Sequence, residues 1–159
     1  GTLASNAMME TVFPKDLTQL NVDAVCARWK SWEARETEIR AAFRDMPQAI
    51  ERILTEGKAK YITTQQLRER LHVLISRWDG LKQKVLTQLI PYQQLRDMLR
   101  AADCPVRPEQ INLTRARVRE TFFLGQMMRA RYTILDLAYE LGCLEAYVDE
   151  IMASSTYLQ

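Results

Sequence analysis

Residues 63–78, Thr-Thr-Gln-Gln-Leu-Arg-Glu-Arg-Leu-His-Val-Leu-Ile-Ser-Arg-Trp, carry the clearest helical pattern in the chain. The leucines at positions 67, 71 and 74 and the tryptophan at position 78 lie three or four residues apart, so they fall on one face of an α-helix. Thr63 and Gln66 have the spacing of a capping box, in which each side chain bonds the other residue's backbone N–H group. We therefore expect an amphipathic helix that opens at Thr63 and packs its apolar face into a core.

Similar apolar spacing occurs on both sides of this stretch. Capping residues, prolines and glycines set the expected boundaries. On the N-terminal side we expect helices from Leu3 to Val12 before Pro14, from Asn21 or Asp23 to Trp29, from Ser31 to Phe43, and from Pro47 to about Gly57. On the C-terminal side, Asp79-Gly80 should break or bend the helix before Leu81, Val85 and Leu89 resume the apolar spacing. Further helices are then expected from Pro91 to Ala102, from Thr114 to Phe122, from Thr133 to Gly142 and from Leu144 to Ile151.

Composition agrees with a helical protein. The chain has 159 residues, of which 47% are hydrophobic, and only five glycines and five prolines. No run of strictly alternating apolar and polar residues is long enough to predict a strand. We predict an all-α, multi-helix bundle that forms one helical domain over residues 1–159. Within it, the helix from Pro91 should bury its apolar stripe of Leu95, Met98, Leu99 and Ala102.

The charge pattern gives no sign of a nucleic-acid or membrane partner. Lysine and arginine number 22 against 20 acidic residues, and the two signs are interleaved along the chain. No apolar stretch approaches the roughly 20 residues of a membrane span, and no signal peptide opens the chain. A soluble, cytoplasmic protein is expected.

Residues that could carry out chemistry are few. Cys26, Cys104 and Cys143 are far apart and form no CxxC pair, so we expect reduced thiols. A catalytic zinc commonly takes two or three histidines, whereas this chain has only His72, which is expected at the solvent edge of its helix. Neither glycine-rich phosphate-binding motif is present. The sequence therefore predicts no catalytic, cofactor-binding or metal-binding residue.

Two side-chain groups have both a functional and a structural interpretation. Six arginines lie between residues 107 and 131 and concentrate positive charge there, and such a group can hold a phosphate. Solvated helix faces and carboxylate partners such as Glu109 and Glu120 are the favoured interpretation. Met127 and Met128 with the neighbouring phenylalanines can form either a partner groove or core, and core packing is favoured. The arginines are Arg107, Arg115, Arg117, Arg119, Arg129 and Arg131, and the phenylalanines are Phe122 and Phe123.

Three stretches resemble one enzyme family. Residues 95–105 are Leu-Arg-Asp-Met-Leu-Arg-Ala-Ala-Asp-Cys-Pro, residues 107–111 are Arg-Pro-Glu-Gln-Ile, and residues 131–137 are Arg-Tyr-Thr-Ile-Leu-Asp-Leu. Together they resemble the C-terminal helical region of bacterial sn-glycerol-1-phosphate dehydrogenases, in the wider group of glycerol dehydrogenases, dehydroquinate synthases and iron-containing alcohol dehydrogenases. Residues 27–43, Ala-Arg-Trp-Lys-Ser-Trp-Glu-Ala-Arg-Glu-Thr-Glu-Ile-Arg-Ala-Ala-Phe, resemble an insertion seen in some bacterial members.

The resemblance implies a function that this chain does not perform alone. In such enzymes an N-terminal Rossmann-like domain binds NAD(P), and an aspartate and two histidines hold zinc or iron while dihydroxyacetone phosphate and sn-glycerol 1-phosphate are interconverted. Gly1-Thr-Leu3 resembles the residues after the family's His-Gly motif, so every metal ligand would precede Gly1. The implied partners are the missing nucleotide-binding domain and metal-binding helices, with a homo-oligomer also possible. We expect the chain alone to be inactive.

The alternative is a stand-alone, non-catalytic helical interaction protein that starts near Met8. Ser5-Asn-Ala-Met8 also has the form of a cleavage scar left by an expression tag, so residues 1–7 are either native or tag-derived. The surface of the first helices should separate the two hypotheses. A domain without its metal-binding helices should expose a contiguous apolar patch there, whereas a self-contained protein should cover that patch or bury it in a homodimer.

Overall fold

A computed structural model describes residues 1–158, and within that range all of the regular secondary structure is helical, with no strand. The all-α prediction is confirmed. The described residues form nine α-helices and one 3₁₀ turn: α1 (Thr2–Val12), α2 (Val22–Ala27), α3 (Trp32–Ala42), α4 (Pro47–Lys60), α5 (Thr64–Leu86), α6 (Tyr92–Ala101), η1 (Pro108–Ile111), α7 (Arg115–Met127), α8 (Ile134–Glu140) and α9 (Leu144–Ala153).

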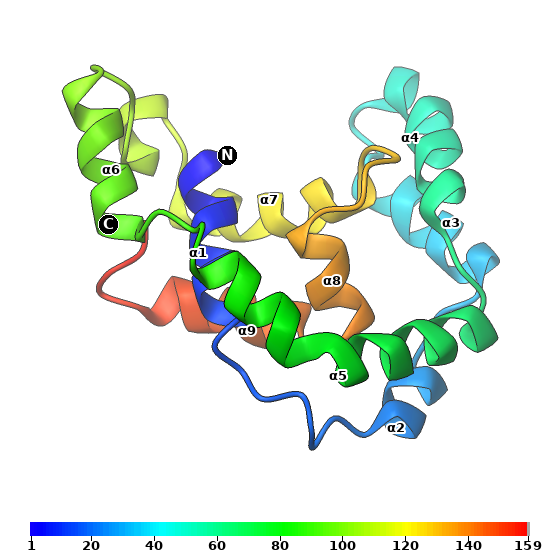
Figure 1. The fold of residues 1–159 in the computed structure, drawn as a ribbon. Coiled ribbons are helices and arrows are strands. Elements are labelled where there is room, and N and C mark those ends of the chain that lie inside the picture. Colours follow the sequence, from blue (N-terminus) through cyan, green and yellow to red (C-terminus); the bar gives the residue numbers. More distant parts are fainter. Residues whose placement is uncertain (159) are drawn as a thin grey trace.

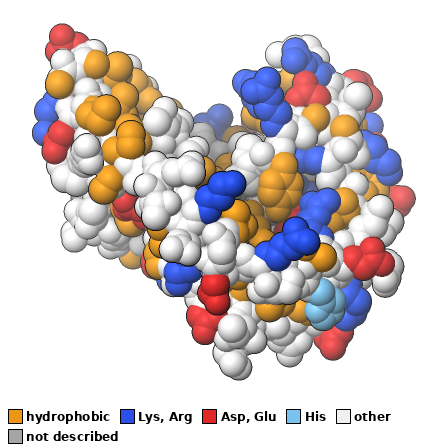
Figure 2. All heavy atoms as spheres, viewed as in Figure 1, with side chains coloured by type: hydrophobic (Ala, Val, Ile, Leu, Met, Phe, Trp, Pro, Cys, Tyr) orange, Lys and Arg blue, Asp and Glu red, His pale blue; other side chains and the backbone are white. Residues whose placement is uncertain are grey.

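Helix α1 lies at the centre of the arrangement and packs against α6, α8 and α9 (Figure 1). Two arms extend from this centre, one made by α6 and the following loop and the other by α3 and α4, which pack on each other. The N-terminus lies in the hollow between the arms, and the space-filling view shows the same hollow (Figure 2). Nothing among the helices of residues 1–158 has the length and apolar character to cross a membrane.

The main core forms around the C-terminal half of α1. Ala7, Met8 and Val12 have no exposed surface, and on α9 Val148 and Ile151 are equally buried. The buried side chains of α1 and α9 are thus the regularly spaced apolar residues from which both helices were predicted. A second, smaller cluster holds the arm of α3 and α4 against α7, and it consists of Ile39, Phe43, Ile53, Leu54 and Leu124.

Side-chain caps fix most helix starts where the sequence predicts them. In the capping box of α5, Gln66 N–H donates to the Thr63 hydroxyl at 3.3 Å and Thr63 N–H donates to Gln66 Oε1 at 2.9 Å. Asn21, rather than Asp23, caps α2 by accepting the Ala24 N–H at 2.9 Å. Ser31, Thr114 and Thr133 also cap helices as predicted. Gly142 ends α8 with a φ of 70°, in the left-handed region that glycine tolerates.

The predicted end of one helix near Gly57 and the predicted break at Asp79-Gly80 are wrong, whereas a bend there, the other predicted outcome, stays untested. Helix α4 does not end near Gly57 but continues to Lys60, because that glycine serves close packing: an added Cβ would lie 3.4 Å from the Ile39 side chain. Helix α5 runs unbroken through Gly80, where nothing lies within 4 Å of an added Cβ. An exposed glycine costs a long helix only about 1 kcal/mol, which the buried face of α5 offsets.

The predicted burial of the α6 stripe is also wrong in large part. Met98 is 53% exposed and Ala102 is exposed, whereas Leu95 and Leu99 are half-buried. Tyr92 is the residue of α6 that is fully buried, and its hydroxyl accepts the Leu158 N–H at 2.8 Å. The reason is the position of α6, which projects from the body as an arm and has no helix on its outer side (Figure 1).

Candidate functional site

The distinctive segment at residues 131–137 places a carboxylate at the centre of a buried polar network. Asp136 Oδ2 accepts the backbone N–H and the hydroxyl of Thr133 at 2.8 and 2.9 Å, which closes the capping box of α8. Its other oxygen accepts Lys60 Nζ from the end of α4 at 2.7 Å and Gln126 Nε2 from α7 at 3.1 Å. One side chain thus joins three helices.

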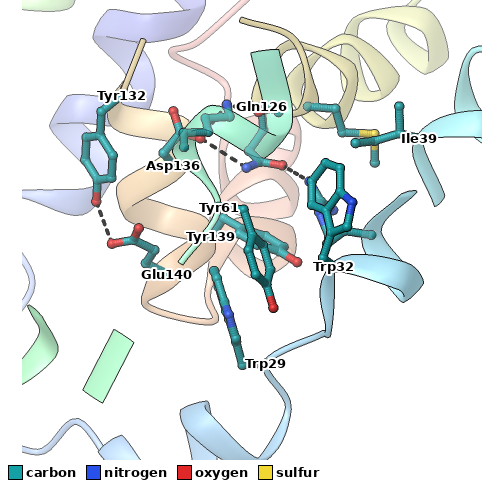
Figure 3. A pocket seen from close by; sticks show the side chains of 13 residues that line it. Trp29, Trp32, Ile39, Tyr61, Gln126, Tyr132, Asp136, Tyr139 and Glu140 are labelled. Carbon is teal, nitrogen blue, oxygen red and sulfur yellow. Dashed lines mark hydrogen bonds and ion pairs between the residues drawn. The ribbon is translucent and has the colours of Figure 1, made fainter. Parts of the chain in front are cut away.

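Gln126 extends the network to α3. Its Oε1 accepts Arg35 Nη2 at 2.6 Å, and the Arg35 guanidinium lies 4.6 Å from the ring centre of Tyr139. Figure 3 shows Gln126 and Asp136 facing one another above a group of aromatic rings. Arg35 and Gln126 are both buried. Because their polar atoms bond to one another, the desolvation cost of these groups is compensated.

A second buried carboxylate lies one helical turn further along α8. Glu140 is 4% exposed and accepts the Tyr132 hydroxyl at 2.9 Å and Arg70 Nη1 at 2.5 Å. Burial raises the pKa of Glu140 above its ordinary value, and the charge of Arg70 offsets part of that rise. Burial together with the Glu140 charge also raises the pKa of Tyr132, so the phenol stays protonated and donates its hydrogen bond.

The raised pKa of Glu140 predicts an unusual pH dependence for a carboxyl group. A carboxyl whose pKa is higher in the folded than in the unfolded protein stabilises the fold below its ordinary pKa, and that contribution is lost as pH rises through the folded value. The protein should therefore lose stability relative to Glu140→Gln as pH rises from about 4, below the ordinary value of 4.5, to neutral. Urea unfolding of both proteins at several pH values checks this, and a relative gain for the unmodified protein would contradict it.

A small cavity lies beside the network, between α8 and the aromatic rings. Its volume is about 40 Å³, and Trp29, Tyr61 and Tyr139 form much of one wall (Figure 3). The ring centres of Trp29 and Tyr139 are 5.2 Å apart, which is ordinary packing distance. The volume admits a water molecule or two, whereas small-molecule sites have volumes of roughly 300–1,000 Å³. Through its hydrogen bonds the polar network links α3, α4, α7 and α8.

A larger groove opens beside the first turn of α1. Its volume is about 580 Å³, and it lies between the α6 arm, residues 1–5 and α7. Apolar side chains dominate its wall, among them Leu3, Leu99, Val106, Leu113, Val118 and Phe122. We call this surface the α1 groove. Apolar grooves of this size on a protein surface are typical of sites that another protein segment covers.

The lone histidine and the three cysteines belong to no metal-binding group in the part of the chain that the structure describes. His72 is exposed on α5. All three thiols are free: Cys26 is buried, Cys143 is half-buried and Cys104 is exposed. Over residues 1–158 no group of three or more His, Cys, Asp or Glu side chains is arranged to hold a metal ion. The residues present do not fit a zinc or iron site, and no glycine-rich loop offers a place for NAD(P) phosphates.

The arginines follow the favoured interpretation in part. Arg117 pairs with Glu120 at 2.5 Å, and Arg119 pairs with Asp149 at 2.9 Å. Arg115 donates to the Met152 carbonyl. Among the apolar candidates, Phe122 is buried in the core whereas Met128 is 37% exposed. Sequence reasoning did not identify Lys60, Gln126 or Arg35 as members of a network, because their partners lie 10 to 91 positions away in the chain.

Comparisons with protein-family models, with curated proteins and with solved structures found no match to this chain.

Proposed function

We propose that this chain is the distal helical domain of an NAD(P)-dependent, metal-dependent dehydrogenase resembling the sn-glycerol-1-phosphate dehydrogenases. The α1 groove is the observation that carries the proposal. An apolar groove beside the first turn of α1 is what a domain separated from its metal-binding helices should expose. The resemblance of residues 95–111 and 131–137 to that family supports the same assignment.

In this proposal the chain's own residues shape and support the active-site cleft. When bound by the rest of the enzyme, a zinc or iron ion would polarise the ketone of dihydroxyacetone phosphate, and NAD(P)H would supply the hydride. The network of Lys60, Gln126 and Asp136 keeps α8 fixed to α4 and α7. The exposed Ile111 and the half-buried Leu99 and Leu113 offer apolar surface in the α1 groove to the helices that would carry the metal ligands.

The test is a comparison of two polypeptides. One is residues 1–159 alone. The other is the same chain extended at its N-terminus by the residues that the source gene encodes before Gly1. With zinc or iron and NAD(P)H, the extended form should reduce dihydroxyacetone phosphate and the short form should not. Turnover by trace-metal-free residues 1–159, or an extension that lacks a His-Gly motif and a glycine-rich nucleotide motif, would contradict the proposal.

A non-catalytic helical interaction protein is the second candidate. Its supporting observation is that Met98 on α6 and Ile111 in the wall of the α1 groove are 53% and 52% exposed. A second copy of the chain would bury such surface. Light scattering coupled to gel filtration separates the candidates. The dehydrogenase proposal expects a monomer of residues 1–159 that binds a hydrophobic dye, and the interaction-protein candidate expects a dimer that does not.

A further inference from the structure

Two aromatic rings, which the proposed function does not use, form an angle on the arm of α3 and α4. Trp32 in the first turn of α3 and Tyr61 at the end of α4 have ring centres 5.6 Å apart and ring planes 65° apart. Trp29 stacks on Tyr61 with ring centres 6.4 Å apart, and Figure 3 shows the three rings together. We call the angle between the Trp32 and Tyr61 rings the aromatic corner.

Hydrogen bonds within the chain hold these rings in place. The Trp29 indole N–H donates to the Ile62 carbonyl at 2.9 Å, and the Tyr61 hydroxyl donates to the Lys30 carbonyl at 3.2 Å. These two bonds join the turn before α3 to the turn before α5. The corner is therefore preorganised, and a ligand that binds there does not have to order the rings first.

A cation of the chain itself occupies the corner. Lys58 Nζ lies 4.6 Å from the centre of the Trp32 ring and 5.5 Å from the centre of the Tyr61 ring, both within the range of cation–π attraction. Within residues 1–158 no carboxylate forms an ion pair with Lys58, whereas Lys30 and Lys60 both pair with carboxylates. The faces of the two rings are thus what attracts a positive charge to this place.

A nearby carboxylate also favours a cation in the corner. Glu33 follows Trp32 in the first turn of α3. Hydrogen bonds to its own backbone N–H group and to Ser31 lower the pKa of the Glu33 carboxyl group, and the charge of Lys58 adds to that shift. The carboxylate is therefore close enough to Lys58 to interact with its charge, and it attracts any other cation in the corner in the same way.

Lys58 is a weak occupant of the corner. Its ammonium group is compact and strongly hydrated, and its exposed side chain has a flexible four-carbon stem, so it can move into water. A quaternary ammonium group is recognised in proteins chiefly by the faces of aromatic rings. Lys58 does not line the small cavity beside the buried network, so the size of that cavity does not limit the corner.

We propose that the aromatic corner binds a quaternary ammonium group, which takes the place of the Lys58 ammonium. The inference goes beyond the proposed dehydrogenase function, because it needs neither NAD(P) nor a metal ion. It is also independent of the α1 groove, since neither ring of the corner lines that groove. A soluble choline-like ion and the headgroup of phosphatidylcholine offer the same chemistry.

The test uses residues 1–159 and two probes. Titration with choline chloride, compared with sodium chloride at the same concentrations, measures the soluble ion through tryptophan fluorescence. Trp78 is buried in the main core and gives a constant background, so a choline-specific change comes from Trp29 and Trp32. Co-sedimentation with phosphatidylcholine vesicles, compared with phosphatidylglycerol vesicles, measures the headgroup.

Two variants of the corner should change the affinity in opposite directions. Lys58→Ala removes the competing ammonium group and should tighten binding about two- to fivefold, the factor that corresponds to one exposed cation–π contact. Trp32→Leu removes one wall of the corner and should weaken binding by at least that factor. Trp32 is half-buried, so circular dichroism must verify the fold of this variant, whereas Lys58 is exposed and its replacement tests the proposal independently.

Lys15→Ala is the matched control. Lys15 lies over a single ring, that of Tyr147 at 5.6 Å, and its removal should leave binding unchanged. Binding of choline, or of phosphatidylcholine vesicles alone, supports the proposal and identifies the source of the ammonium group, provided that Lys58→Ala tightens it and Lys15→Ala does not. Absence of binding to both probes, or equal responses of the two lysine variants, would overturn the proposal and leave the dehydrogenase assignment unaffected.

Discussion

Replacing Asp136 with asparagine is expected to lower the free energy of unfolding by about 3–5 kcal/mol, the cost of breaking a buried ion pair from one side. Asp136 and Lys60 are 2.7 Å apart, and their side chains are 5% and 11% exposed. Asparagine preserves the size of the side chain but leaves the Lys60 ammonium without a carboxylate in a place that water reaches poorly. Urea unfolding, monitored by circular dichroism, measures this decrease in the free energy of unfolding.

Two further variants show whether the effect comes from the pair. Lys60→Met combined with Asp136→Asn should cost less than the sum of the single changes, since neither charge is then left unpaired. Glu150→Gln disrupts the exposed Lys15–Glu150 pair and should cost less than about 1 kcal/mol. Equal losses for Asp136→Asn and Glu150→Gln would show that the buried network contributes no more than a surface pair does.

The helix starts were predictable because their causes are local. A capping side chain bonds a backbone group two or three residues away, so Thr63, Ser31 and Thr133 can be recognised in the sequence without knowledge of the fold. The same holds for Gly142, whose φ of 70° follows from the short-range geometry of a helix end. The all-α class follows from such local patterns.

Features that depend on distant contacts were not predictable. Gly57 has the sequence context of a helix end, but the side chain of Ile39 from another helix determines its role. The partners of Asp136 on other helices are also distant in the sequence, with Gln126 10 and Lys60 76 positions away. The amphipathic stripe of α6 is a true feature of the sequence, yet a periodic pattern does not specify whether another helix covers it. The exposure of Met98 shows that no helix covers this part of the stripe, which the sequence pattern could not indicate.

The α1 groove and residues 1–7 raise the same question of what belongs to the folded unit. Leu3 is 6% exposed, Ala7 has no exposed surface, and Asn6 Nδ2 donates to the Ile90 carbonyl at 2.9 Å, which ties α1 to the start of α6. Glu10, one turn later, accepts the Tyr92 N–H at 2.6 Å. One face of the first two turns of α1 is thus packed and hydrogen-bonded to the rest of the protein, whereas Thr2 and Ser5 are exposed.

A chain that lacks residues 1–7 is therefore expected to lose about 3–6 kcal/mol of stability, from the buried leucine and the lost hydrogen bond. Leu3→Ala alone should cost about 2–4 kcal/mol, whereas Leu81→Ala, at a site that is 37% exposed, should cost less than about 1 kcal/mol. Thermal and urea unfolding of the three variants measure these differences. If the shortened chain matched the full one, residues 1–7 would be dispensable, as a protein starting near Met8 requires. A large loss instead makes them part of the central helix, on which the dehydrogenase proposal depends.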